Sequence, residues 1–336
     1  MANNTRFLLS VLENHTRNTT SICQILEPFL DLQARESLPH FYVITSTAAS
    51  LLNVITCFTT LLLNTMVILA IWMTPSLRHE PKNILLCSLA VSDFFVGLSS
   101  QPSFLIAEIS LILGETEQYC YAVFIHFYTS WIFSGISFLT LSAISIERYL
   151  ALRFHLRYTQ LITTTRVVIT VIIYWLIWVM WITILWFGVR NRLLTYVLIA
   201  FCILIAVGDV WCYFVIYKTV RRHNSQIQHS QSHDQKIMAR YRRTTITMVL
   251  LVCAFAGSYL PFVITTAISA SQYKEDLRTS AAHCMAVAFV FVNSCVNPLI
   301  YFWRVSEFRD AAKRTLRKFH LMKPVSRVDT ELDSRL

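Results

Sequence analysis

Several polar side chains that could bind a small cation lie inside long apolar stretches of this sequence. Asp93 stands in the middle of "SLAVSDFFVG", with no basic residue next to it. An ionisable group at bilayer depth is costly and is therefore a functional candidate. Further polar residues lie at comparable depth in other apolar stretches: Asn64, Ser137, Asn293, Ser294 and Asn297. For each one alone, a bond to a backbone carbonyl or a neighbour is the simpler interpretation, but the set predicts one polar network that suits a small cation or water.

A charge pair and two prolines form a second group of candidates. Glu147 and Arg148 in "AISIERYL" end an apolar run. Taken alone, this pair could anchor a helix end at the membrane surface. Pro261 in "SYLPF" and Pro298 in "NPLIY" each remove a backbone donor and weaken a helix locally. A single proline in a membrane helix is often only structural, but two that lie beside aromatic residues are candidate hinges.

Composition predicts the elements that position these residues. Of 336 residues, 55% are hydrophobic and only 14% are charged, whereas soluble domains carry about 25% charged residues. A helix needs roughly 20 apolar residues to cross a bilayer, and it satisfies its own backbone groups there. We therefore predict an all-α membrane protein, a seven-transmembrane helix bundle over 41–303 with helices at about 41–72, 83–107, 119–150, 167–187, 193–220, 243–270 and 281–303.

Charge and sequons predict the orientation of this bundle. The segments 73–82, 148–166, 217–243 and 302–336 hold 22 of the 29 basic residues. Because basic residues collect on the cytoplasmic side, the N-terminus is expected outside and the C-terminus inside. The polar stretch 1–40 shows no cleavable signal and is expected to be an extracellular, glycosylated tail, with sequons at Asn3, Asn14 and Asn18.

A short amphipathic helix, helix 8, is predicted at 304–320, followed by a cytoplasmic tail at 321–336. Its apolar residues recur at helical spacing: Phe308, Ala312, Leu316 and Phe319. Basic residues interleave with them: Arg309, Lys313, Arg314, Arg317 and Lys318. Such a helix is expected to lie on the anionic lipids of the inner leaflet. A basic helix facing water is the alternative.

The sequence gives little support for an enzyme, a nucleic-acid-binding protein or a transporter. The sequence shows no metal-ligand spacing, phosphate loop or nucleophile elbow, so it does not predict an enzyme or a metal site of the usual kind. The net charge of +10 is explained by topology, and no soluble basic domain suggests a nucleic-acid partner. A multispan transporter or channel stays the alternative, although we find no internal repeat. Of nine cysteines, Cys23, Cys120 and Cys284 lie outside or near the outer rim, and their pairing stays open.

The chain resembles a rhodopsin-like (class A) G-protein-coupled receptor across roughly residues 41–319. The residues that carry the resemblance follow the family's order: Asn64, Asp93, Glu147-Arg148-Tyr149, Trp175, Tyr213, Phe255, Pro261, Asn297-Pro298 with Tyr301, and Phe308. The resemblance implies a multi-pass plasma-membrane receptor that binds an extracellular ligand, activates a heterotrimeric G protein and can bind arrestin.

The resemblance also implies roles for single residues. In the active state Arg148 would contact the G protein and Tyr213, and in the inactive state Glu147 would hold Arg148. Phe255 and Pro261 would form a hinge. The remaining switch residues would be Tyr149, Asn297, Pro298 and Tyr301. The family's sodium site would be matched by Asn64, Asp93, Ser137, Asn293 and Asn297, so sodium is the one cofactor implied.

Departures from the family pattern narrow the branch. Tyr259 stands where the family usually has Trp, Ile205 where the fifth span has Pro, and Val123 where the third span has Cys. The outer loop "GVRNR" also lacks Cys. These features are loosely similar to the melanocortin, cannabinoid, lysophospholipid and adenosine branch. Tyr241 replaces a common acidic partner of Arg148, so we expect appreciable basal activity.

The residues at the expected ligand-binding positions exclude several known types of ligand recognition. Ser130 occupies the place of the Asp of amine receptors, and Phe291 that of the Lys of opsins. Val123, Phe127 and Thr266 likewise replace polar ligand-binding residues of the melanocortin and adenosine receptors. The predicted pocket consists of His126, Ser130, Trp131, Ser134, Tyr259, Phe262, Thr266, His283 and Phe291. This aromatic set with few charges suits a small, moderately polar or lipid-like ligand that is not an amine.

A few titratable residues keep two interpretations. His126 and His283 could sense protons, but hydrogen-bonded rim residues are the simpler interpretation. Glu108, Glu115 and Glu117, near the first outer loop, could attract a cation, but a solvated loop is more usual. Asp209 lies one turn from Tyr213, on the same face of the fifth span. It is either a buried acid bonded to a neighbour or a modulator of the Tyr213 switch.

Overall fold

The computed structural model describes residues 38–154, 157–187, 192–226, 232–271, 276–304 and 306–321. The sequons, Cys23 and the tail beyond residue 321 lie outside these ranges. The described elements are α3 (His40–Met73), α4 (Pro75–Arg78), α5 (Pro81–Phe95), the π-helix η1 (Val96–Ser100), α6 (Gln101–Leu113), α7 (Thr116–Arg153), α8 (Tyr158–Leu161), α9 (Thr164–Phe187), α10 (Arg192–Gln226), α11 (Ser232–Ser271), α12 (Leu277–Arg304) and α13 (Ser306–Leu321).

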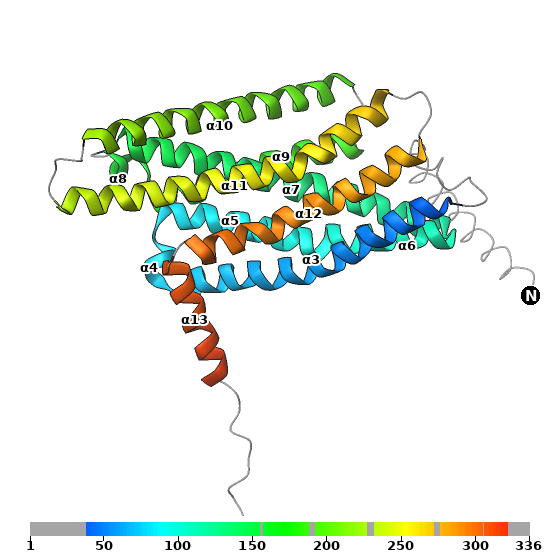
Figure 1. The fold of residues 1–336 in the computed structure, drawn as a ribbon, viewed down its shortest axis with the longest axis horizontal. Helices are drawn as coiled ribbons and strands as arrows, with labels where there is room; N and C mark the ends of the chain where they lie inside the picture. Colours follow the sequence, from blue (N-terminus) through cyan, green and yellow to red (C-terminus); the bar gives the residue numbers. More distant parts are fainter. Residues whose placement is uncertain are drawn as a thin grey trace, which may run out of the picture.

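The described residues form a bundle of long helices that run alongside one another (Figure 1). Within the described residues, six helical segments are long and apolar enough to cross a membrane, and α10 contributes a shorter apolar stretch, Ala200–Ile216. The predicted all-α, seven-helix fold is confirmed. Helix α13 lies at one end of the bundle with α4 and α8, and we call this the α13 end.

The second span runs through α5, η1 and α6 as one rod from Pro81 to Leu113. It ends where Gly114 takes the left-handed conformation, with φ of 75°. Glu108 was expected near a loop but lies within α6 and is 9% exposed. Its cost of burial is offset by Ser46 of α3, whose hydroxyl donates to the Glu108 carboxylate at 2.5 Å.

The π turn η1 leaves backbone carbonyls that neighbouring helices satisfy. Cys57 Sγ of α3 lies 3.2 Å from the Gly97 carbonyl, and Asn53 Nδ2 donates to the Gln101 carbonyl at 2.8 Å. His126 Nδ1 of α7 bonds the Ser100 carbonyl at 3.1 Å. A break in a membrane helix is tolerated when side chains restore its backbone hydrogen bonds.

Helix α13 packs against the bundle through Phe308, Ala311 and Thr315, all nearly fully buried. Phe308 lies 6.1 Å from the Tyr301 ring, between ring centres. The predicted apolar face is shifted, because Ala311 contacts Ala70 and Leu77 while Ala312 is only half-buried. The side chains of Leu316, Lys318 and Phe319 lie outside the described set. Four predicted basic residues are exposed: Arg309, Lys313, Arg314 and Arg317.

Candidate functional site

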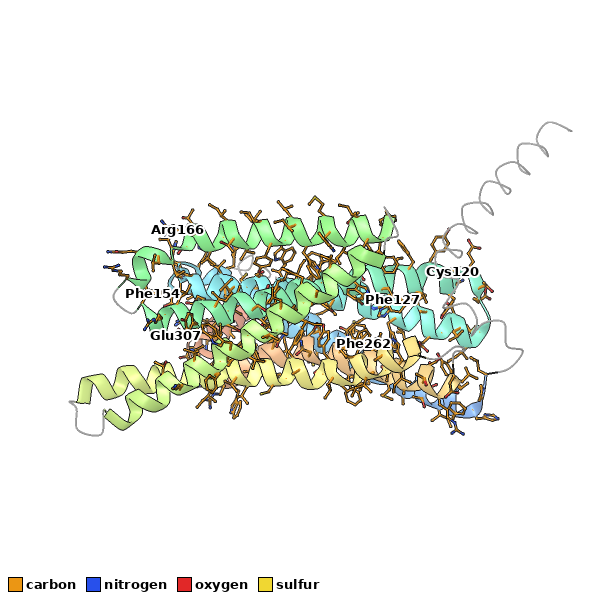
Figure 2. The ribbon with its side chains drawn as sticks, turned by 90° about the horizontal axis from the view of Figure 1, so that it is seen from above. Cys120, Phe127, Phe154, Arg166, Phe262 and Glu307 are labelled. Atoms are coloured by element: carbon orange, nitrogen blue, oxygen red, sulfur yellow. The ribbon has the colours of Figure 1, made fainter. Side chains whose placement is uncertain are left out.

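A cavity of about 390 Å³ lies between α7, α9, α10, α11 and α12. Phe127 of α7 and Phe262 of α11 line it, toward the Cys120 end of the bundle rather than the end that carries Phe154, Arg166 and Glu307 (Figure 2). Of the predicted pocket residues, those on its lining are His126, Ser130, Trp131, Ser134, Tyr259, Phe262 and Phe291.

Two predicted pocket residues are not on this lining. Thr266 is exposed, and its hydroxyl donates to the Phe262 carbonyl at 2.7 Å. His283 Nδ1 lies 3.1 Å from Thr265 Oγ1, and its ring centre lies 5.2 Å from that of Phe262. His283 therefore supports a cavity wall without lining the cavity itself.

His126 both supports the π turn and lines the cavity. Its Nδ1 bonds the Ser100 carbonyl of η1 at 3.1 Å. Because a carbonyl oxygen only accepts, Nδ1 carries the proton in this bond, and in the neutral ring Nε2 is left as an acceptor. The ring also lies 5.8 Å from Phe291, between ring centres. His126 can therefore offer the cavity one hydrogen-bond acceptor.

A glycine and a tryptophan that sequence reasoning missed form one wall. Trp178 of α9 lies so close to Gly135 of α7 that a β-carbon at residue 135 would overlap the indole ring. Trp178 Nε1 donates to the Trp131 carbonyl at 3.1 Å. The indole therefore lines the cavity with its N–H already bonded. A mid-helix Gly is the only sequence signal, and it does not identify its partner.

The polar network predicted around Asp93 assembles only in part. Ser137 Oγ donates to Asp93 Oδ1 at 3.1 Å, and Asn297 Nδ2 donates to Asp93 Oδ2 at 2.7 Å. Asn64 Nδ2 instead bonds the Ser294 carbonyl at 3.0 Å. Asn293 makes no side-chain hydrogen bond through Oδ1 to any described residue. The Oδ1 atoms of Asn64 and Asn297 are likewise buried and unbonded within the described residues.

An aromatic stack connects the cavity to the interior of the bundle. Phe255 and Tyr259 of α11 stack with ring centres 4.2 Å apart, and Phe138 of α7 stacks on Phe255 at 5.6 Å. Tyr259 also forms a hydrogen bond with Ser134. The candidate hinge residue Pro261 lies just beyond this stack in α11, and Pro298 lies inside α12. A ligand in the cavity would thus touch the residues next to a candidate hinge.

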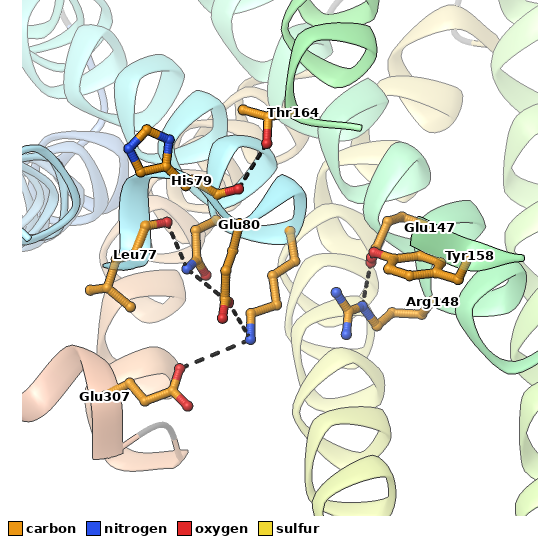
Figure 3. Close-up of polar contacts among 10 residues, drawn as sticks. Leu77, His79, Glu80, Glu147, Arg148, Tyr158, Thr164 and Glu307 are labelled. Carbon is orange, nitrogen blue, oxygen red and sulfur yellow. Dashed lines mark hydrogen bonds and ion pairs between the residues drawn. The ribbon is translucent and has the colours of Figure 1, made fainter. Parts of the chain in front are cut away.

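At the α13 end, Arg148 forms an ion pair with Glu147. Tyr158 of α8 donates a hydrogen bond to the other oxygen of the same carboxylate (Figure 3). The side chain of Glu147 is 4% exposed and that of Arg148 is 13% exposed. The sequence suggested that Glu147 alone holds Arg148. Tyr158, which sequence reasoning missed, fixes Glu147 from the neighbouring loop.

Two serines of α7 hold α10. Ser142 Oγ donates to Asp209 Oδ2 at 2.6 Å, and Ser145 Oγ lies 2.8 Å from the Tyr213 hydroxyl. Asp209 is therefore bonded to a neighbour, as the simpler interpretation holds. It is also part of the same helix contact as Tyr213, one turn away. At the same end, Tyr149 packs on Trp211 with ring centres 5.5 Å apart.

Comparison with known proteins identifies the family. The chain matches the family described as "7 transmembrane receptor (rhodopsin family)" over residues 63–193 and 186–301. The chain belongs to the rhodopsin family of seven-transmembrane receptors. It is 27% identical over 280 residues to trace amine-associated receptor 9 of Mus musculus, covering 74% of this chain and 79% of that protein. It is 22% identical over 287 residues to melanopsin of Branchiostoma belcheri, covering 75% of this chain and 40% of that protein.

This membership confirms that the chain is a class A G-protein-coupled receptor, a multi-pass membrane protein and not an enzyme. The narrower branch suggested by the short outer loop stays a prediction.

The structure answers part of the question of how the outer cysteines pair. Cys120 is disulfide-bonded and Cys284 is free, so these two do not pair with each other. The remaining candidate partner, Cys23, lies outside the described residues.

Proposed function

We propose that this receptor binds a small, uncharged extracellular ligand in the cavity beside Tyr259 and activates a heterotrimeric G protein at the α13 end. The proposal includes a plasma-membrane location with the N-terminus outside. The observation that carries the proposal is the Glu147–Arg148 pair, held by Tyr158 at the end opposite the cavity. A buried ion pair that one loop residue secures can be released by a modest movement.

The ligand class follows from the cavity lining. The names of the trace amine-associated relatives suggest an amine ligand. The described cavity lining, however, contains no Asp or Glu to pair with an ammonium group. An unpaired charge inside a membrane protein is costly. Ser130, on the lining, occupies the place where the resemblance puts the amine-binding Asp. Phe291, also on the lining, replaces the Lys that the resemblance gives to opsins.

Activation is proposed to bend a helix at a proline and to change the hydrogen-bond partners of Tyr213 and Arg148. In the described state Tyr213 contacts Ser145, and Arg148 contacts Glu147. Ligand contact with Tyr259 would favour bending at Pro261, because the proline has no backbone donor there. Moving α11 outward would open space beside Arg148, and the Tyr213 side chain could then turn from Ser145 toward Arg148. Ligand binding therefore shifts a population between two bundle states.

The Asp93 network fits a sodium ion. It offers one carboxylate, the Ser137 hydroxyl and the unbonded amide oxygen of Asn297. These are hard oxygen donors with a single negative charge, which suits a monovalent cation better than a divalent one. Bound sodium would supply a positive charge that keeps Asp93 ionised and draws α5, α7 and α12 together, favouring the resting state.

The exposed basic face of α13 is proposed to lie on anionic lipids of the inner leaflet. The opposite face of this helix is anchored by Phe308 and Ala311. Each basic residue near such a surface contributes about 1 kcal/mol to the binding of the helix to the membrane.

Arrestin is proposed to bind the same end of the bundle as the G protein.

Nucleotide exchange tests the coupling. We expect cells that express the receptor with G proteins to show GTPγS exchange above that of empty cells, and Arg148→Ala to abolish it. Tyr158→Phe removes the hydrogen bond to Glu147 but leaves the ring, so basal exchange should rise. Tyr128→Phe, a matched loss of one hydroxyl that bonds Thr183 near the opposite end, should leave basal exchange unchanged. Transport of a solute without any exchange would favour the transporter alternative and overturn the proposal.

Sodium dependence tests the ion site separately. Agonist affinity in the wild type should fall as sodium replaces potassium at constant ionic strength, because sodium stabilises the resting state. Asp93→Asn keeps the shape of the side chain but removes its charge, and should abolish this dependence. An equal sodium response in both proteins would remove the ion from the proposal and leave the coupling intact.

A further inference from the structure

We infer that the ligand cavity opens sideways to the bilayer between α10 and α11, and that it receives an uncharged lipophilic molecule carrying one hydrogen-bond donor. This inference rests on the proposed receptor function. It names the class of ligand and the route by which the ligand arrives.

Several residues line the cavity and face outward at the same time. Ile203 of α10 and Val263 of α11 are on its lining, yet their side chains are 59% and 56% exposed. Ala206 of α10 is likewise on the lining and exposed. These residues lie within the apolar stretches that cross the membrane, so the medium around their outer faces is lipid. In the view of Figure 2, α10 and α11 diverge toward the Cys120 end.

Other residues of the lining lie inside the bundle, although Trp131 of α7, also on the lining, is 44% exposed. Val287 and Phe291 of α12 are 7% and 1% exposed, and Trp178 of α9 and His126 of α7 are each 5% exposed. All four line the same cavity. The cavity therefore extends from side chains in contact with lipid to side chains buried among helices. A molecule dissolved in the membrane could reach the aromatic stack at Tyr259 without crossing water.

The lining also sets the chemistry of the occupant. It contains no Asp, Glu, Lys or Arg among the described residues, so a permanently charged ligand would lack an oppositely charged partner. Ser134 and Tyr259 bond each other, and Trp178 donates to a backbone carbonyl. His126 uses Nδ1 for the Ser100 carbonyl, which leaves Nε2 to accept one hydrogen bond. An alcohol or secondary amide on an apolar body matches this lining, and a cavity of about 390 Å³ is within the usual range for small-molecule sites.

Photolabelling in lipid nanodiscs tests the route. The probe is an uncharged aryl diazirine with one primary alcohol, and its partner is the same diazirine with a quaternary ammonium in place of the alcohol. After illumination, peptide mapping reads carbene insertion at two places. Val287 and Phe291 report the buried end of the cavity. Val210, 68% exposed on α10 and not part of the lining, reports the bilayer.

The expected result is labelling of Val210, Val287 and Phe291 by the alcohol probe. Labelling of the two cavity residues by the ammonium probe should be roughly a hundredfold weaker, because a charge at mid-membrane costs about 3 kcal/mol. Ala206→Trp should block the opening and remove most labelling of Val287 and Phe291 while Val210 stays labelled. Leu204→Trp, at a 71% exposed neighbour outside the lining, should leave all three sites unchanged.

Three outcomes overturn the inference. One is labelling of Val210 without Val287 and Phe291. Another is equal labelling of the cavity residues by both probes, which indicates access from water. The third is undiminished cavity labelling in Ala206→Trp. Nucleotide exchange that depends on Arg148 would stand in each case, so the receptor function can survive the loss of this route. Cavity labelling without any exchange would instead overturn the coupling alone.

Discussion

The half of the bundle built from α3, the second span, α7 and α12 is buried more completely than the half built from α9, α10 and α11. In the most apolar windows, the buried share is 33% in His40–Met73, 61% in Pro81–Leu113, 44% in Thr116–Ala151 and 61% in Leu277–Arg304, against 11% in Thr164–Phe187 and 6% in Val249–Ser269. The hydrophobic effect does not drive helices together in lipid. An apolar helix can therefore stay loosely packed in a membrane, where the same helix in water would have to be buried.

Polar side chains join the second span to α3 more extensively than they join α10 to α7. Between α3 and the second span, Asn53, Ser46 and Cys57 bond Gln101, Glu108 and the Gly97 carbonyl. Between α7 and α10, the described side chains that form hydrogen bonds across the contact are Ser142 and Ser145, with Asp209 and Tyr213. The more buried half therefore serves as a frame, and the less buried half contains the parts that are expected to move.

Shortening a leucine in each half should show the largest contrast. Leu89 of α5 is fully buried, and Leu204 of α10 is 71% exposed. Leu89→Ala should lower the free energy of unfolding by about 2–5 kcal/mol, because it leaves a cavity in close packing. Leu204→Ala should change it by less than about 0.5 kcal/mol. Thermal unfolding in one detergent measures both, and similar losses would remove the distinction between the halves.

Two glycines give a sharper contrast of opposite sign. Gly135→Ala should destabilise the protein by about 1–3 kcal/mol, because the added methyl group overlaps the Trp178 ring. Gly208→Ala in α10 meets no atom within 4 Å and should stabilise the helix by about 0.5–1 kcal/mol. The shift of Trp178 should also change its fluorescence in the first variant. Stabilisation by Gly135→Ala would show that the indole is not held against α7.

A small effect on stability is expected at the contact between the halves. Ser142→Ala removes the hydrogen bond to Asp209 and should cost about 0.6 kcal/mol, the usual value for such bonds between membrane helices. Its effect on signalling should be clearer, with raised basal exchange because α10 is less firmly held. Ser142→Thr, which keeps the hydroxyl, is the control. Unchanged basal exchange in Ser142→Ala would mean that Asp209 has a structural role only.

The sequence predicted the helices correctly because they depend on local signals, and the roles of the switch residues stay predictions. Long apolar runs define the spans, and Glu147-Arg148 and Asn297-Pro298 are contiguous motifs. The partners that tertiary packing supplies were missed. Tyr158 reaches Glu147 from another helix, and Gly135 receives Trp178 from α9. Glu108 was misplaced because an acidic residue after an apolar run usually marks a helix end, whereas here Ser46 allows it to remain inside.

The π turn in the second span has a consequence for how this receptor can evolve. The extra residue of η1 and the side chains of Asn53, Cys57 and His126 depend on one another, since each side chain bonds a carbonyl within or next to the turn. Replacing one side chain while the turn remains leaves a carbonyl without its partner. Deleting one residue from the turn would rotate everything beyond it by about 100°. The effects of substitutions in this group should therefore depend strongly on one another. Because His126 also lines the ligand cavity, a substitution there changes both the ligand-binding surface and the support of the π turn.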